Sequence, residues 1–314
     1  MLAAMPEEDS MPDDPNGGDP GSHLARPGRT RDPDVGQAGT LGLVPAARRL
    51  GRAFARLRPP GWVGVRARVA EPPLVKAAKI LYEYTSTLYF PLNQVQVWQR
   101  AVLWPRLLLI EYLVYRADAI TERNRDNDLD TTRSSDYELL YRYKRRFEQL
   151  LRSLGAWSAT VAGLVDDGET FARLENALSS GTTATAADLR RIAELRPTDV
   201  RLLHAATVAM LGRADDAALR DALWPAEVLA DIANDLEHYA QDVRNATFNL
   251  YAEYVNLYPS DAPDRLRETI DGYHRELAAK VDALPSARRG AVRDQCRALV
   301  RDRLDRIPPP AEDA

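Results

Sequence analysis

The stretch DIANDLEHYAQD, residues 231–242, is the most informative part of this chain. Side chains three or four positions apart lie on the same face of a helix, so the polar residues of this stretch form one stripe. Apolar residues occupy the remaining positions, in a helical pattern that runs from Trp224 to Tyr258. Such a helix would be roughly 50 Å long at 1.5 Å per residue, and it needs neighbouring helices to cover its apolar side. The stretch therefore predicts an all-α fold, a single-domain helical bundle.

The polar stripe consists of Asp231, Asn234, Asp235, His238 and Asp242. Acidic stripes on helices are usually solvated, and they usually have basic partners four residues away. This stripe contains no lysine, and it includes an asparagine and a histidine, which both ligate metals. The residues alone leave two interpretations open, a solvated helix face and a divalent-cation site.

The composition indicates a folded helical region preceded by a leader. Of the 314 residues, 45% are hydrophobic and 28% are charged, as in ordinary globular proteins. Residues 1–40 are rich in Pro, Gly, Asp and Ser, and they have too few apolar side chains to offset chain entropy. Residues 44–69 are rich in arginine, which suits either a flexible leader or contact with an acidic partner or membrane surface. We expect a disordered, basic leader over 1–70, one helical domain over 71–307 and a tail over 308–314.

Charge, cysteine content and hydropathy narrow the class of protein. A net charge of −4 does not indicate a general affinity for nucleic acid. The single cysteine, Cys296, rules out an intramolecular disulfide or a thiolate metal cluster, and it fits a reducing, cytoplasmic setting. The longest apolar run, residues 101–115, contains Pro105, Arg106 and Glu111 and is too short for a transmembrane segment. The apolar helices would allow a homodimer.

Apolar spacing of three to four residues dominates from Pro72 onward, which is typical of helices. Thr198 and Asp199 read as an N-cap, Gly155 and Gly212 suit helix C-termini, and Pro105 would kink its helix or lie near its start. The expected helices span residues 74–90, 92–124, 135–154, 157–178, 186–195, 198–212, 223–258, 262–283 and 287–305.

A second acidic pattern lies near the end of the expected helix 92–124. Asp118 and Glu122 are four residues apart, on the same helix face, and they follow the apolar run 107–114. On their own they also fit an exposed helix end. If this helix faces the helix that carries the stripe, their carboxylates would form the mouth of an apolar pocket. Carboxylates so close together would require a hard cation such as Mg²⁺, which shares its coordination with phosphate oxygens.

Two segments resemble the class I isoprenoid synthases, especially bacterial terpene cyclases. NDLEHYAQD, residues 234–242, is similar to the family's second metal motif, Asn-Asp-x-x-Ser-x-x-x-Glu, with His238 in place of Ser or Thr and Asp242 in place of Glu. LRPT, residues 195–198, resembles the stretch that holds the diphosphate-sensing arginine, here Arg196. Asp118 and Glu122 are the best match to the first metal motif, although Ala117 stands where the family has a further aspartate.

The resemblance implies an all-α class I terpenoid synthase fold and a Mg²⁺-dependent terpene cyclase. Such an enzyme ionises a linear prenyl diphosphate and cyclises the resulting carbocation. Arg196 and Arg244 would bind the diphosphate, and the implied Mg²⁺ ligands are Asp118, Glu122, Asn234, His238 and Asp242. The implied pocket is dry and aromatic, with candidate lining residues Tyr82, Tyr89, Phe90, Trp98, Trp104, Tyr112, Tyr115, Phe248 and Tyr251.

Two other functions fit the same residues. YLVYRAD, residues 112–118, is similar to the approach to the first acidic motif of the squalene and phytoene synthases, and Asp231-x-x-x-Asp235 could correspond to their second. A prenyl-coupling enzyme of that kind would consume two prenyl diphosphates. The changed ligand positions also suit a catalytically silent helical protein that serves as a binding or scaffold module.

Overall fold

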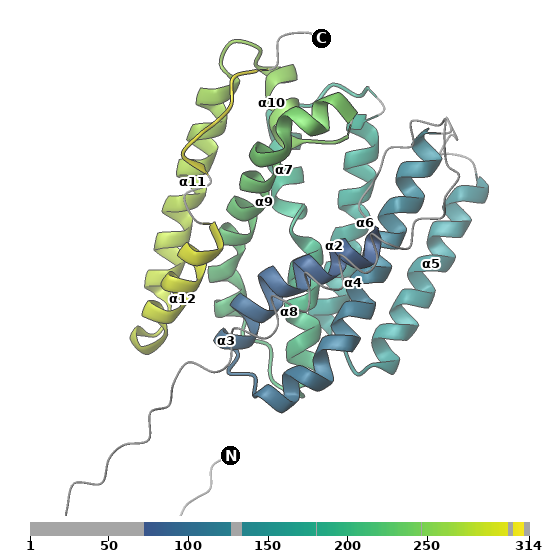
Figure 1. Cartoon of the computed structure of the whole chain (residues 1–314), viewed down its shortest axis with the longest axis vertical. Coiled ribbons are helices and arrows are strands. Elements are labelled where there is room, and N and C mark those ends of the chain that lie inside the picture. Colours follow the sequence, from purple (N-terminus) through teal and green to yellow (C-terminus); the bar gives the residue numbers. More distant parts are fainter. Residues whose placement is uncertain (1–71, 127–133, 180, 246, 301–303, 311–314) are drawn as a thin grey trace, which may run out of the picture. The chain divides into compact units, whose positions relative to one another are not determined.

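The structure is a computed structural model, and it describes residues 72–126, 134–179, 181–245, 247–300 and 304–310 (Figure 1). Every regular element in these ranges is a helix, with no strand, which confirms the predicted all-α class. Within the same ranges, no helix is both long and apolar enough to cross a membrane. The leader expected over residues 1–70 lies outside the described residues. Pro308, in the expected tail, accepts a 2.6 Å hydrogen bond from the Tyr251 hydroxyl.

The described helices agree with most of the ranges expected from apolar spacing. Gly155 and Gly212 follow helix ends with φ of 70° and 64°, as expected of C-terminal glycines. Pro105 lies inside a helix. In chain order the elements are α2 (Pro73–Ile80), the π-helix η1 (Leu81–Tyr89), α3 (Phe90–Leu92), α4 (Val97–Asp126), α5 (Ser134–Ser153), α6 (Ala159–Ser179), α7 (Ala186–Leu195), α8 (Thr198–Met210), α9 (Ala217–Asn245), α10 (Leu250–Leu257), α11 (Ala262–Ala283) and α12 (Ser286–Val300).

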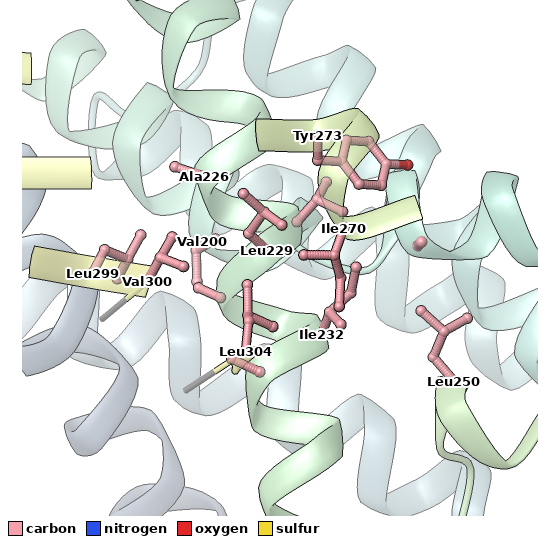
Figure 2. Close-up of a cluster of buried hydrophobic side chains, with 14 of the residues drawn as sticks. Val200, Ala226, Leu229, Ile232, Leu250, Ile270, Tyr273, Leu299, Val300 and Leu304 are labelled. Atoms are coloured by element: carbon pink, nitrogen blue, oxygen red, sulfur yellow. The ribbon is translucent and has the colours of Figure 1, made fainter. Parts of the chain in front are cut away.

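Helix α9 is the centre of the packing. It contacts α11, α12, α10 and α7, whereas α8 packs against α4, α6 and η1 (Figure 1). Its apolar face belongs to a hydrophobic cluster in which Ala226, Leu229 and Ile232 meet Ile270 of α11 (Figure 2). A second cluster joins α4 and α8 through residues such as Leu107 and Leu203. Burial of these side chains, at about 1.5–3 kcal/mol each, is what holds the short loops and long helices together.

The predicted N-cap of α8 at Thr198 and Asp199 is wrong. Pro197 is the N-cap residue and makes no side-chain capping bond, while Arg196 has helical angles of φ −54° and ψ −46°. The Thr198 hydroxyl instead donates to the carbonyl of Leu195. Because proline lacks an N–H, Pro197 interrupts a nearly continuous helix and leaves Arg196 at the break.

The expected helix 223–258 is also wrong as a single element, because the chain breaks between α9 and α10. Asn249 caps α10, and its side-chain oxygen accepts from the N–H groups of Tyr251 at 3.0 Å and Ala252 at 3.2 Å. The same amide donates to the Asp235 carbonyl at 2.8 Å and to the Asp242 carboxylate at 2.9 Å. One buried asparagine therefore begins α10 and fastens it to α9.

Asn249→Ala should lower the free energy of unfolding by about 2 kcal/mol or more, because the cap is lost and buried acceptors on α9 lose their donor. Urea denaturation checks this change. Asn256→Ala, at an exposed position on the same helix, is the matched control and should stay within about 0.5 kcal/mol of the wild type. If the two variants are equally stable, Asn249 does not have this role.

Candidate functional site

Charged and hydroxyl-bearing side chains gather in the interior of the bundle, and we call this group the charged centre. Glu111, Glu227 and Asp235 are essentially buried, at 0%, 1% and 1% exposure. Hydrogen bonds, ion pairs and longer-range charge interactions relate side chains from α2, η1, α4, α8, α9 and the α7–α8 break. Its members are Lys76, Tyr84, Tyr89, Glu111, Tyr115, Arg196, Asp199, Arg201, Glu227, Asp231 and Asp235.

The strongest contact in the charged centre is the ion pair between Arg196 and Asp235. One guanidinium nitrogen donates to a carboxylate oxygen at 2.8 Å, and a second nitrogen lies 2.6 Å from the other oxygen. The N–H of Leu250, at the start of α10, also donates to this carboxylate at 2.8 Å. Burial opposes the charged form of Arg196, but Asp235 and then Asp231 raise the pKa of its guanidinium above the ordinary value. A fixed positive charge therefore lies at the α7–α8 break.

A second ion pair joins Arg201 of α8 to Glu227 of α9, with 3.0 Å between the arginine Nε and the carboxylate. The Tyr89 hydroxyl donates to the other Glu227 oxygen at 2.8 Å. Arg201 also donates to the Glu194 carbonyl at 2.9 Å, which ties the end of α7 to the same place. Burial raises the pKa of Glu227, and Arg201 and Tyr89 oppose that rise.

The π-helix η1 directs two tyrosines towards α9. Hydrogen bonds from i to i+5 bring residues five apart towards the same face, which an α-helix does not do. Tyr84 and Tyr89 are five apart, and they donate to Asp231 at 3.4 Å and to Glu227 at 2.8 Å. π-Helical segments are rare in proteins, and those that occur are often found at functional sites. Here the π-helix matches two hydroxyls to two carboxyls that lie one turn apart on α9.

Burial raises the pKa of two acids of the charged centre, Glu111 and Asp231. Burial, followed by the charge of Asp199, raises the pKa of Glu111 well above its usual range. In the described residues neither Glu111 oxygen has a hydrogen-bond partner, because the nearby Tyr115 hydroxyl gives its proton to Asp199 at 3.0 Å. Burial also raises the pKa of Asp231 to about 8, against the influence of Arg196. Interior carboxyls of this kind can donate or accept a proton near neutral pH.

The residues predicted on α9 as metal ligands lie along its more exposed side. Asn234 and His238 are exposed, and Asp242 is half-buried. The His238 Nδ1 lies 2.9 Å from the Asn234 carbonyl, which leaves Nε2 as the ring nitrogen for a ligand. Asn249 orients the Asp242 carboxylate. Hydrogen bonds of this type orient metal ligands, and amide, imidazole and carboxylate donors suit a divalent cation.

The three donors are far apart for side chains that bind one cation. Asn234 and Asp242 are eight residues apart, about 12 Å along the helix, and Asp242 is one methylene shorter than a glutamate. In the described part of the chain, no three His, Cys, Asp or Glu side chains converge on a single point. The α9 residues therefore have the donor types and the orienting bonds for a cation, and they need further oxygen ligands from substrate or water.

The other predicted site residues are Asp118 and Glu122 of α4 and Arg244 of α9. Asp118 of α4 is 3.7 Å from the ammonium of Lys76, which itself lies 4.2 Å over the Tyr115 ring. Asp118 is thus linked through Lys76 and Tyr115 to Asp199 of α8. The Glu122 side chain lies outside the described residues. Arg244 is exposed, two positions beyond Asp242 on α9.

The aromatic residues expected to line a dry pocket include exposed residues and members of the hydrogen-bonded interior. Tyr82 and Trp98 are 49% and 69% exposed, so their expected place in a pocket wall is wrong. Tyr89 stacks on His204 at 4.5 Å and belongs to the hydrogen-bonded interior. Tyrosine hydroxyls instead connect α4 to α8, through Tyr115 and Asp199, and η1 to α9, through Tyr84 and Tyr89.

Sequence reasoning missed Glu111, Glu227 and Asn249 as members of the site. The two glutamates stand inside apolar helical runs, and a carboxylate at a core position is the signal that could have identified them. Comparisons of this chain with protein-family models, with curated proteins and with solved structures gave no match. The functional argument therefore rests on the residues and their geometry.

The raised pKa of Asp231 predicts a pH-dependent stability. The carboxyl titrates near pH 4 in the unfolded chain and at about 8 in the folded one, so the folded state binds more protons between these values. Stability should therefore fall as pH rises through this window, by up to about 1.4 kcal/mol per pH unit. Because Glu111 and Glu227 also have raised pKa values, Asp231→Asn should make that slope smaller in urea denaturation from pH 5 to 8, by up to about 1.4 kcal/mol per pH unit. Asp264→Asn, exposed on α11, should keep it, and parallel curves for wild type and Asp231→Asn would contradict the assignment.

Proposed function

We propose that this protein is a Mg²⁺-dependent class I isoprenoid synthase of the terpene-cyclase kind, acting on a linear prenyl diphosphate. The observation that carries the proposal is the ion pair of Arg196 and Asp235, residues 39 apart in sequence. It joins the arginine at the α7–α8 break to the helix that carries the three α9 donors. The two segments that resemble the family in sequence are therefore in contact through this pair.

The α9 donors and Arg196 would have different roles in binding a diphosphate. Asn234, His238 and Asp242 would hold the divalent cation, which would neutralise negative charge on the departing diphosphate. Arg196 has five N–H donors, of which one donates to Asp235, and it would give charge-assisted hydrogen bonds to phosphate oxygens. Arg244 lies near enough in sequence to Asp242 to add a further positive charge at the exposed end.

The raised pKa of Asp231 favours an anionic substrate. If this carboxyl were ionised, its negative charge near Arg196 would repel a diphosphate. Since burial raises its pKa to about 8, the carboxyl is largely neutral at pH 7 and the guanidinium keeps its attraction for an anion. The Asp231 proton is held at the carboxyl that also accepts from Tyr84.

A catalytically silent binding or scaffold protein is the second candidate. The ion pair of Asp118 with Lys76 and the separation of the α9 donors favour it. The prenyl-coupling alternative needs Asp231 and Asp235 as metal ligands. Asp235 is instead buried and bound by Arg196 and by the Leu250 N–H, which suits a structural role.

Incubation with geranyl, farnesyl or geranylgeranyl diphosphate and Mg²⁺ tests the proposal directly. We expect release of pyrophosphate and a cyclic product, detected by gas chromatography. Arg196→Lys should lower turnover at least tenfold, because a compact ammonium replaces the planar guanidinium, which has more N–H donors. Arg191→Lys, exposed on α7, is the control and should keep wild-type turnover. A product with doubled carbon number would indicate prenyl coupling, and neither product nor pyrophosphate would indicate the silent protein.

Asp242→Glu should lower the Mg²⁺ concentration for half-maximal turnover several-fold, because the added methylene extends the carboxylate towards Asn234. The measurement is a Mg²⁺ titration of pyrophosphate release. Glu237→Asp changes carboxylate length on the same helix outside the three donors and serves as the control. An unchanged Mg²⁺ requirement in Asp242→Glu would remove Asp242 from the set of ligands.

A further inference from the structure

A hollow of about 440 Å³ lies between α7, α10 and α11, and its lining contains no member of the charged centre. Two small residues, Ala186 of α7 and Gly272 of α11, leave room for it. A Cβ placed on Gly272 would meet no atom within 4 Å, so the space above this glycine is open. The volume is in the range of small-molecule pockets.

Tyr273 supplies the polar group of this hollow. Its side chain is only 5% exposed, and its hydroxyl has no hydrogen-bond partner among the described residues. The ring packs edge-on against Trp224, with centroids 6.0 Å apart. Figure 2 shows the hydroxyl directed away from Leu229 and Ile270 of the hydrophobic cluster. A buried hydroxyl without a partner costs about 1–3 kcal/mol, so an acceptor that enters the hollow would recover this energy.

Two further tyrosines form an aromatic wall. The rings of Tyr254 and Tyr258 have centroids 6.2 Å apart. The Tyr254 hydroxyl lies 2.9 Å from the Thr269 hydroxyl, which fixes that ring, and Arg265 lies over the Tyr258 ring at 5.7 Å. A planar ring system would pack against these faces in an offset or edge-on geometry.

Nearby charges select the kind of acceptor. Burial, followed by the charge of Glu194, raises the pKa of Tyr273, so the hydroxyl keeps its proton and acts as a donor. Glu276 adds more negative charge, with Arg190 as the opposing cation. Arg190 is itself paired with Glu194 at 2.9 Å. Glu276 is likewise paired with Lys280 at 3.1 Å, and Arg265 with Glu268 at 3.2 Å. Because the charges around the hollow are paired with opposite charges, a neutral carbonyl oxygen suits the hydroxyl better than an anion.

We propose that this hollow is a binding site for a neutral, planar aromatic or conjugated molecule with a carbonyl oxygen. The Tyr273 hydroxyl would donate to the carbonyl, and Tyr254 and Tyr258 would pack against the planar body. This site is independent of the proposed prenyl diphosphate chemistry.

The probe for the test is prodan, a neutral naphthalene ketone whose emission shifts to the blue in apolar surroundings. Titration of the full chain should give saturable binding at one site with blue-shifted emission. Gly272→Leu should fill the hollow and weaken binding at least tenfold, while its helix propensity favours α11. Gly290→Leu is the matched control, since a Cβ there also meets nothing within 4 Å, and it should bind within twofold of the wild type.

Tyr273→Phe should weaken prodan binding about fivefold, as expected for one lost hydrogen bond. Thermal unfolding followed by circular dichroism checks that each variant is folded, and Tyr273→Phe decides the case if Gly272→Leu is not. The proposal is overturned if the wild type gives no saturable binding. Equal affinity in all folded variants also overturns it, because the dye would then bind elsewhere.

Discussion

The buried ion pair of Arg196 and Asp235 is the interaction on which the rest of the structure depends. It fixes the proline break between α7 and α8 against α9, and the same carboxylate accepts the first N–H of α10. A carboxylate at 1% exposure is stable only with such partners, since loss of one member of a buried pair costs about 3–5 kcal/mol. The position of the α9 donors relative to the arginine follows from this contact.

The charged centre is compatible with a folded interior because some of its acids are neutral. Glu227 and Asp235 have arginine partners, whereas burial raises the pKa of Glu111 and Asp231. Hydroxyls from the π-helix η1 donate to Asp231 and Glu227 on α9. A protonated Asp231 lowers the negative charge near Arg196, as the proposed anionic substrate requires.

Apolar spacing was enough to predict the helical class and most helix positions, because the core of a bundle repeats with the helix period. It did not predict the break before α10, since Asn249 acts there through contacts to residues 7 and 14 positions away. The metal-ligand pattern drew attention to Asn234, His238 and Asp242, which do share one side of α9. Glu111 was read as an interruption of an apolar run, because a sequence does not reveal that a carboxyl is buried and protonated. Tyr82 and Trp98 were expected inside, but aromatic character alone does not distinguish a core from a surface.

A double-mutant cycle on Arg196 and Asp235 tests the central claim most directly. The free energy of unfolding is measured for the wild type, Arg196→Met, Asp235→Asn and the double variant. If the pair organises the break, α9 and α10 together, the single changes should be strongly destabilising. Their sum should then exceed the effect of the double change by at least about 2 kcal/mol. Additive effects within about 0.5 kcal/mol would contradict the account, because the two residues would then act independently.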